Sequence, residues 1–153
     1  MGTGKSVMNK LIMLSHVFLG AACLLSSVWV FIAALNSTGS NQTQVRTASW
    51  ASAIFMWLSF VVAGYWYVTS YGAVKAVILS GPWPFAHSFF METKEHLAII
   101  LLLLATYLPI ASAGKDARRL VLWVSGLVIL LALAMMVGGI IIAMGIHAGF
   151  QAQ

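Results

Sequence analysis

Four long apolar segments, separated by short polar ones, constrain this chain more than any other feature. They cover about residues 7–35, 50–79, 87–111 and 119–150. A helix needs about 20 apolar residues to cross the roughly 30 Å hydrocarbon core of a bilayer, and each segment is long enough. Backbone in lipid must satisfy its hydrogen bonds internally, so the segments are expected to be helical. The sequence predicts an all-α fold, an integral membrane four-helix transmembrane bundle with a single domain over residues 1–153.

The composition is that expected for a chain embedded in a lipid bilayer. Of its residues 61% are hydrophobic and only 7% are charged, whereas a soluble domain has charge on about a quarter of its residues. The lysines and arginines stand at the ends of the apolar segments, where they anchor helices at lipid headgroups. The net charge of +5 therefore indicates contact with the lipid bilayer and no nucleic acid.

The first apolar segment is expected to be a span and not a signal peptide. The apolar core of a signal peptide has about 7–15 residues before a cleavage site, whereas residues 11–35 form a longer run that carries His16. The lone cysteine, Cys23, lies within this run and has no second cysteine with which to form an internal disulfide.

Short connections predict an up-down topology. A polar stretch at residues 36–43, a Ser-Gly-Pro-Trp-Pro breaker at 80–84 and a charged loop at 114–119 separate the segments. Helices joined by short loops are antiparallel neighbours, so both termini and the 80–90 connection are expected on one side of the membrane.

The positive-inside rule does not orient the bundle by count alone. Each side has four basic residues: Lys5, Lys10, Lys75 and Lys94 on the side of the termini, and Arg46, Lys115, Arg118 and Arg119 on the other. The second group crowds three charges into one short loop, which favours a cytoplasmic position for that loop. The side of the termini is then predicted to be extracytoplasmic.

The topology brings all four histidines into one half of the bundle. His16, His87, His96 and His147 come from distant parts of the chain, yet each is near the side of the termini. Ionisable residues inside spans are costly and raise a functional hypothesis. For His87 and His147 singly, plain hydration at the interface is an equally good explanation.

Two helix faces lead to histidines through small residues. On the first segment His16, Gly20, Cys23 and Ser27 share a face, and on the fourth Ala132, Met136, Gly139, Ala143 and His147 do. Small residues let helices pack closely in lipid, and they also clear space for a flat ligand. The sequence is compatible with both uses.

A haem b is the cofactor that this pattern favours. His16 and His96 lie at similar distances from their helix starts, so they are predicted to face each other across the core as axial ligands. His87 is nine residues from His96 and points to the opposite side of an ideal helix. Lys94 or Lys10 is then a partner for a haem propionate at the interface. The absence of a C-x-x-C-H motif excludes covalent attachment.

The layout resembles that of small four-helix membrane cytochromes b, in architecture only. The predicted haem near one membrane face implies electron transfer, between a quinone and a protein partner. The chain is accordingly expected to be a redox or accessory subunit more than a self-sufficient enzyme.

Two other functions stay open. An accessory or scaffold subunit without haem, bound to other membrane subunits, needs no cofactor pocket. A copper-binding or copper-transport protein is suggested by thioether and imidazole side chains three residues apart. The alternative metal ligands are His87, His147, Met13, Met144 and Glu92.

Three further chemistries find no support in the sequence. A di-iron bundle within a single chain is excluded, because it needs glutamates from four helices and this chain has only Glu92 and Glu95. No Ser-His-Asp set or Gly-rich phosphate loop is present, so nucleophilic catalysis and nucleotide binding have no support.

Overall fold

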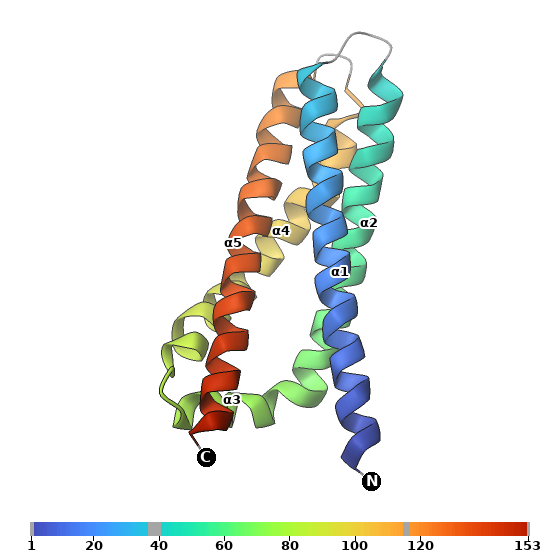
Figure 1. Cartoon of the computed structure of the whole chain (residues 1–153). Helices are drawn as coiled ribbons and strands as arrows, with labels where there is room; N and C mark the ends of the chain where they lie inside the picture. Colours follow the sequence, from blue (N-terminus) through green and yellow to red (C-terminus); the bar gives the residue numbers. More distant parts are fainter. Residues whose placement is uncertain (1, 37–40, 115–116, 153) are drawn as a thin grey trace.

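The structure, a computed structural model, describes residues 2–36, 41–114 and 117–152, with side chains from residue 7 onward. Every regular element in these residues is helical, which confirms the all-α prediction. The elements are α1 (Gly2–Leu35), α2 (Gln42–Trp66), η2 (Tyr67–Tyr71), α3 (Gly72–Ser80), η3 (Ala86–Met91), α4 (Glu92–Ala111) and α5 (Arg118–Gln151) (Figure 1). The segments η2 and η3 are π-helical.

Four stretches of the described residues are long and apolar enough to cross a membrane. They are Val7–Leu35, Gln42–Ser80, Ala86–Ala111 and Arg118–Gln151. The second begins at Gln42 and not near Trp50, as the sequence had indicated. Its polar first turn is held by tertiary contacts, since the Gln42 side chain donates to the Ser112 carbonyl at 2.7 Å and Val45 is buried.

The helices run up and down as predicted. Both termini and the 81–85 turn lie at one end of the bundle, which we call the basal end, and the other two connections lie at the opposite, loop end (Figure 1). At the loop end Arg118 donates from Nε to the Ala34 carbonyl at 3.0 Å. It also donates from Nη2 to the Leu35 carbonyl at 2.7 Å, so the last carbonyls of α1 are satisfied.

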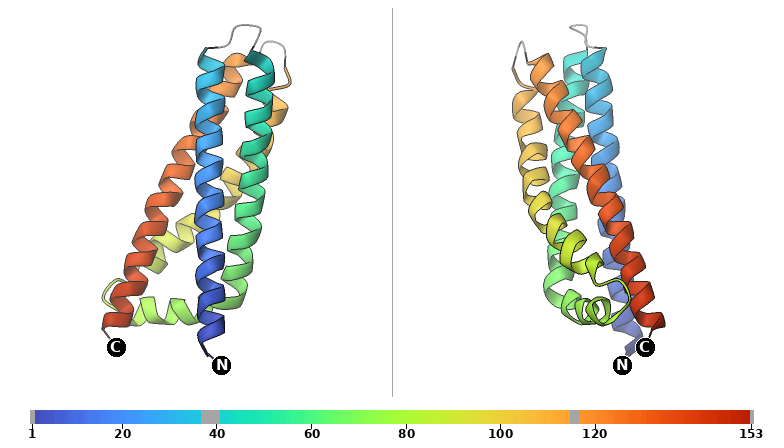
Figure 2. Two further views of the ribbon diagram at one scale, coloured as in Figure 1. Left: turned by 45° about the vertical axis from the view of Figure 1, so that its right-hand side comes forward. Right: turned by 90° about the vertical axis from the view of Figure 1, so that its left-hand side faces the viewer.

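The second span is not straight. After α2 the chain widens into η2, and α3 then lies across the basal end towards α5 (Figures 1 and 2). Glycines allow this approach, because a Cβ at Gly149 would lie 2.6 Å from the Val77 carbonyl oxygen and one at Gly81 would lie 2.7 Å from the Gly149 Cα. The crossing is therefore made by α2, and α3 forms the base of the bundle.

The core is divided into three clusters along the bundle axis. Near the loop end all four spans pack together in a cluster that includes Val30 of α1 and Val121 of α5. A middle cluster contains Cys23 and Leu101. Below it α1 and α5 separate (Figure 1 and the left view of Figure 2). The basal cluster joins η2, α3, η3 and α5 around Ile78, which is fully buried.

Candidate functional site

The four histidines lie in the basal half, as the topology predicts, but they have different surroundings. His16 is half-buried on α1 and His87 is buried on η3, whereas His96 on α4 and His147 on α5 are exposed. They do not converge on one interior space.

His16 is turned towards α2. Its Nδ1 lies 2.9 Å from the Ser59 hydroxyl and 3.2 Å from the Ser59 carbonyl oxygen. The Ser59 hydroxyl in turn donates to the His16 carbonyl at 3.3 Å. The consistent assignment places the proton on Nδ1, which leaves Nε2 with its lone pair. An imidazole held in this way is oriented for a ligand at Nε2.

The small-residue face of α1 is a helix–helix contact. A Cβ at Gly20 would lie 3.7 Å from the Ser59 hydroxyl. Further along, the Ser27 and Ser52 hydroxyls are 2.7 Å apart and the Cys23 sulfur lies 3.7 Å from the Ser52 hydroxyl. Of the two uses that the sequence left open for this face, close packing against α2 is the one observed.

Lys94 lies between α4 and α5. Its aliphatic stem covers Gly138, where a Cβ would be 3.2 Å from the lysine Cδ, and its ammonium Nζ would be 3.2 Å from a Cβ at Gly139. The ammonium is also close enough to act on His16 electrostatically. In the described part of the chain Lys94 has no carboxylate partner. His16 and Gly20 thus both face Ser59 of α2, and Lys94 packs on α5; that these residues bind a cofactor stays a prediction.

The prediction that His96 faces the bundle interior is wrong. Its side chain is exposed, and its Nδ1 donates to the Glu92 carbonyl of its own helix at 2.7 Å. It lines a shallow depression of about 380 Å³ on the outer face of α4, together with Ser88, Phe89, Glu92, Thr93 and Leu97. The pair His16 and His96 therefore does not fit a haem within one chain.

The phase of α4 explains this error. The interior face carries Lys94, Leu101, Ala105 and Leu108, which follow one another at spacings of three, four and seven residues. His96 is two residues from Lys94, about 200° around the helix. The helix after His96 is apolar on every side. Its sequence therefore does not distinguish an interior face from a lipid-facing one.

His87 makes a buried contact with Tyr71 that is not predicted from the sequence. Only 5% of the residue is exposed, and the Tyr71 hydroxyl lies 2.8 Å from its Nδ1. Tyr71 is itself buried and stacks on Tyr67 with ring centroids 5.0 Å apart. The expectation that His87 and His96 point to opposite sides is confirmed. Tyr71 and His87 belong to different spans and are 16 residues apart, so no local pattern in the sequence indicates their contact.

This contact joins the two π-helical segments, since Tyr71 ends η2 and His87 lies in η3. Single π-helical turns are frequent at functional sites because they redirect side chains out of regular register.

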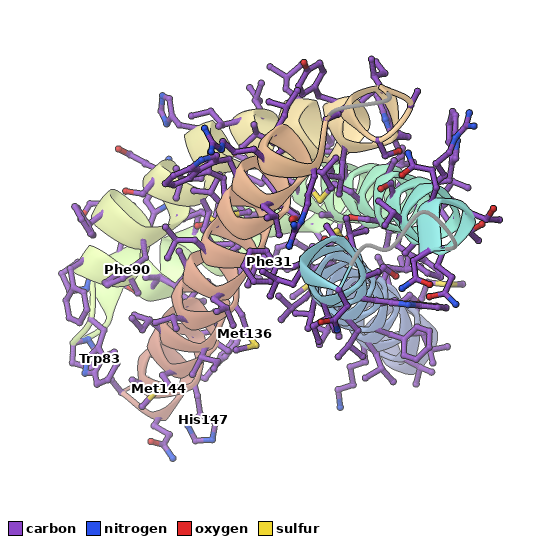
Figure 3. All side chains as sticks on the ribbon, turned by 90° about the horizontal axis from the view of Figure 1, so that it is seen from above. Phe31, Trp83, Phe90, Met136, Met144 and His147 are labelled. Atoms are coloured by element: carbon purple, nitrogen blue, oxygen red, sulfur yellow. The ribbon has the colours of Figure 1, made fainter. Side chains whose placement is uncertain are left out.

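The remaining alternative ligands are not gathered into a centre. His147 is exposed near the end of α5, and Met144 on the same helix is half exposed (Figure 3). Met13 packs against the basal cluster. Among the described residues no group of three or more His, Cys, Asp or Glu side chains is placed to hold a metal ion.

No protein-family model matches the chain, and no curated protein or solved structure shows significant similarity to it.

Proposed function

We propose that this chain is an accessory subunit of a larger membrane complex. The observation that carries the proposal is the outer face of η3 and α4, where Ser88, Glu92, Thr93 and His96 are exposed within a span apolar enough to cross a membrane. Charged and polar side chains are costly against lipid and as a rule face protein or water-filled space. A neighbouring subunit would supply their partners.

The packing of the interior supports the same proposal. His16 and His87 are used to join helices, through Ser59 and Tyr71. The small residues Gly20, Cys23 and Ser27 of α1 lie against serines of α2, so this face is used for helix packing. The basic residues lie near the helix ends, and the connections between the helices are short. The outer face of α4 is therefore the surface whose polar side chains suit specific recognition of a partner.

Site-specific photo-cross-linking in native membranes tests this proposal. A benzophenone amino acid at Thr93, in the middle of the outer face, should form a discrete protein adduct of reproducible mass. The same group at Leu25, which is 68% exposed on α1, is the matched control and should react with lipid. Lipid adducts alone at both positions would contradict an assembly through α4.

Electron transfer with a haem b is the second candidate. Two features favour it: the Nε2 of His16 is left free by the Ser59 contact, and the ammonium of Lys94 lies nearby without a carboxylate partner in the described residues. His16 would hold the iron and Lys94 would pair with a propionate. The haem would supply one-electron chemistry, for exchange with a quinone or a redox partner. Because His96 is exposed on the outer face, the second axial ligand would be a residue other than His96.

An absorption spectrum of the purified, reduced protein tests the haem candidate. A sharp α band that is lost in His16→Ala and kept in His147→Ala would support it, because His147 is exposed and far along α5. A wild-type protein without any haem band, purified from haem-replete cells, would remove this candidate and leave the accessory subunit.

A further inference from the structure

One imidazole and one carboxylate stand side by side on the outer face of α4. Glu92 and His96 are one helical turn apart, and both are exposed. The bond from His96 Nδ1 to the Glu92 carbonyl, 2.7 Å long, leaves Nε2 as the free coordinating atom. The other glutamate of this helix, Glu95, is exposed as well, but with Glu92 and His96 it does not form a group of three placed to hold a metal ion.

This pair supplies half of a metal site. Zn²⁺ and similar divalent ions take four ligands from imidazole nitrogen, carboxylate oxygen and thiolate. One chain offers two such ligands here, and no third His, Cys, Asp or Glu of the described residues joins them. A site on this face is therefore incomplete without a partner that contributes two more.

We propose that two copies of this chain bind one divalent cation through Glu92 and His96 of each copy. The inference rests on the proposed function, because it identifies the partner that binds the outer face of α4 as a second copy of this chain. A twofold axis along the membrane normal places the same residues of both copies at the same depth. The site then contains two imidazoles and two carboxylates, a common ligand set for Zn²⁺.

Charge and shape favour a second copy on this face. The two carboxylates neutralise the doubly charged ion, so the completed site carries no net charge into the membrane. Phe89 and Leu97 line the same depression as the ligands and give apolar contact around them. Thr93 lines the same depression and is small enough for helices to approach to about 8–10 Å between axes, the usual distance for packed helices.

The test uses the full chain in detergent micelles and in nanodiscs, with Zn²⁺ as the probe. Binding is measured by calorimetry and elemental analysis, and mass by light scattering. The expected result is about half an equivalent of Zn²⁺ per chain, four ligands being shared between two copies, and a dimer that EDTA dissociates. His96→Ala and Glu92→Gln should each weaken binding by at least about tenfold, an effect that even outer-shell partners of metal ligands reach.

Two matched controls should bind Zn²⁺ as the wild type does. His147→Ala removes an exposed histidine of α5, and Glu95→Gln changes the neighbouring carboxylate of α4. Equal loss in the controls, one Zn²⁺ per monomer, or no uptake at micromolar Zn²⁺ would overturn the inference. If Thr93 still cross-links to a different protein, the accessory function holds while the metal-bridged dimer fails.

Discussion

At the scale of single residues, the buried contact between Tyr71 and His87 makes the clearest prediction. Tyr71→Phe removes the hydroxyl and leaves the His87 Nδ1 without its partner in a buried place. We expect the free energy of unfolding to fall by about 1–3 kcal/mol, the usual cost of an unsatisfied buried polar group. Detergent-to-SDS titration followed by circular dichroism measures this change.

Tyr107→Phe is the control for that experiment. Tyr107 is 42% exposed on α4, so loss of its hydroxyl should change stability little. If both variants unfold like the wild type, the contact between η2 and η3 does not stabilise the basal end.

The paired serines of α1 and α2 give a second prediction at this scale. Ser27→Ala and Ser52→Ala should be coupled in a double-mutant cycle, because their hydroxyls are 2.7 Å apart. Hydrogen bonds between membrane helices average about 0.6 kcal/mol in such cycles, and we expect a coupling energy of that size. A cycle of Ser27→Ala with Ser80→Ala should show additive effects, since Ser80 bonds within α3.

Residues also show where the sequence was and was not informative about the site. His16 could be recognised from the sequence as a candidate site residue because it interrupts an apolar run. Lys94 could be recognised because it is a charged residue at a similar depth in the membrane. The outward direction of His96 could not be predicted because it depends on how α4 packs against its neighbours, and the Tyr71 partner of His87 could not be predicted because it lies on a different span.

At the scale of elements, the contact of α3 with α5 depends on glycine. Gly149→Ala should destabilise the protein by about 1–3 kcal/mol, the usual cost of overpacking. The added methyl would lie 2.6 Å from a backbone oxygen of Val77, which cannot move without shifting α3. Unfolding titrations measure the loss, and Trp83 near α5 offers a local fluorescence signal.

Gly64→Ala is the matched control on α2. A Cβ there meets nothing within 4 Å, and alanine favours a helix over glycine by about 0.5–1 kcal/mol. This variant should be as stable as the wild type or slightly more stable. Destabilisation of the same size at both positions would mean that α3 does not rest on α5.

At the scale of the whole molecule, the orientation in the membrane is a prediction from charge. The basic residues divide equally between the two ends, but the connection at residues 114–119 crowds three of them into one short stretch. We therefore expect the loop end to be cytoplasmic.

Cysteine labelling in a Cys23→Ala background tests this orientation. We expect Gln151→Cys to react with an impermeant maleimide from outside intact spheroplasts, and Thr43→Cys to react only in inverted vesicles. Reversed labelling would overturn the orientation alone. Labelling of both from one side would contradict the four crossings.

The sequence by itself determined the bundle, its four crossings and the half in which the histidines lie. These follow from the length and apolarity of the segments and from short connections, which are local properties that lipid enforces on any such chain. The sequence did not reveal the α3 turn at the end of the second span, because residues 72–80 are as apolar as the span before them.

Only the tertiary structure decided which way each polar side chain faces. A helix that is apolar all round has no inherent inside, so its rotation is set by the shapes of its neighbours. The glycines of α5 admit Lys94 to the interior, and this rotation turns Glu92 and His96 outward. Which polar side chains α4 exposes therefore depends on how α4 packs against α5. No local sequence pattern in α4 predicts that packing.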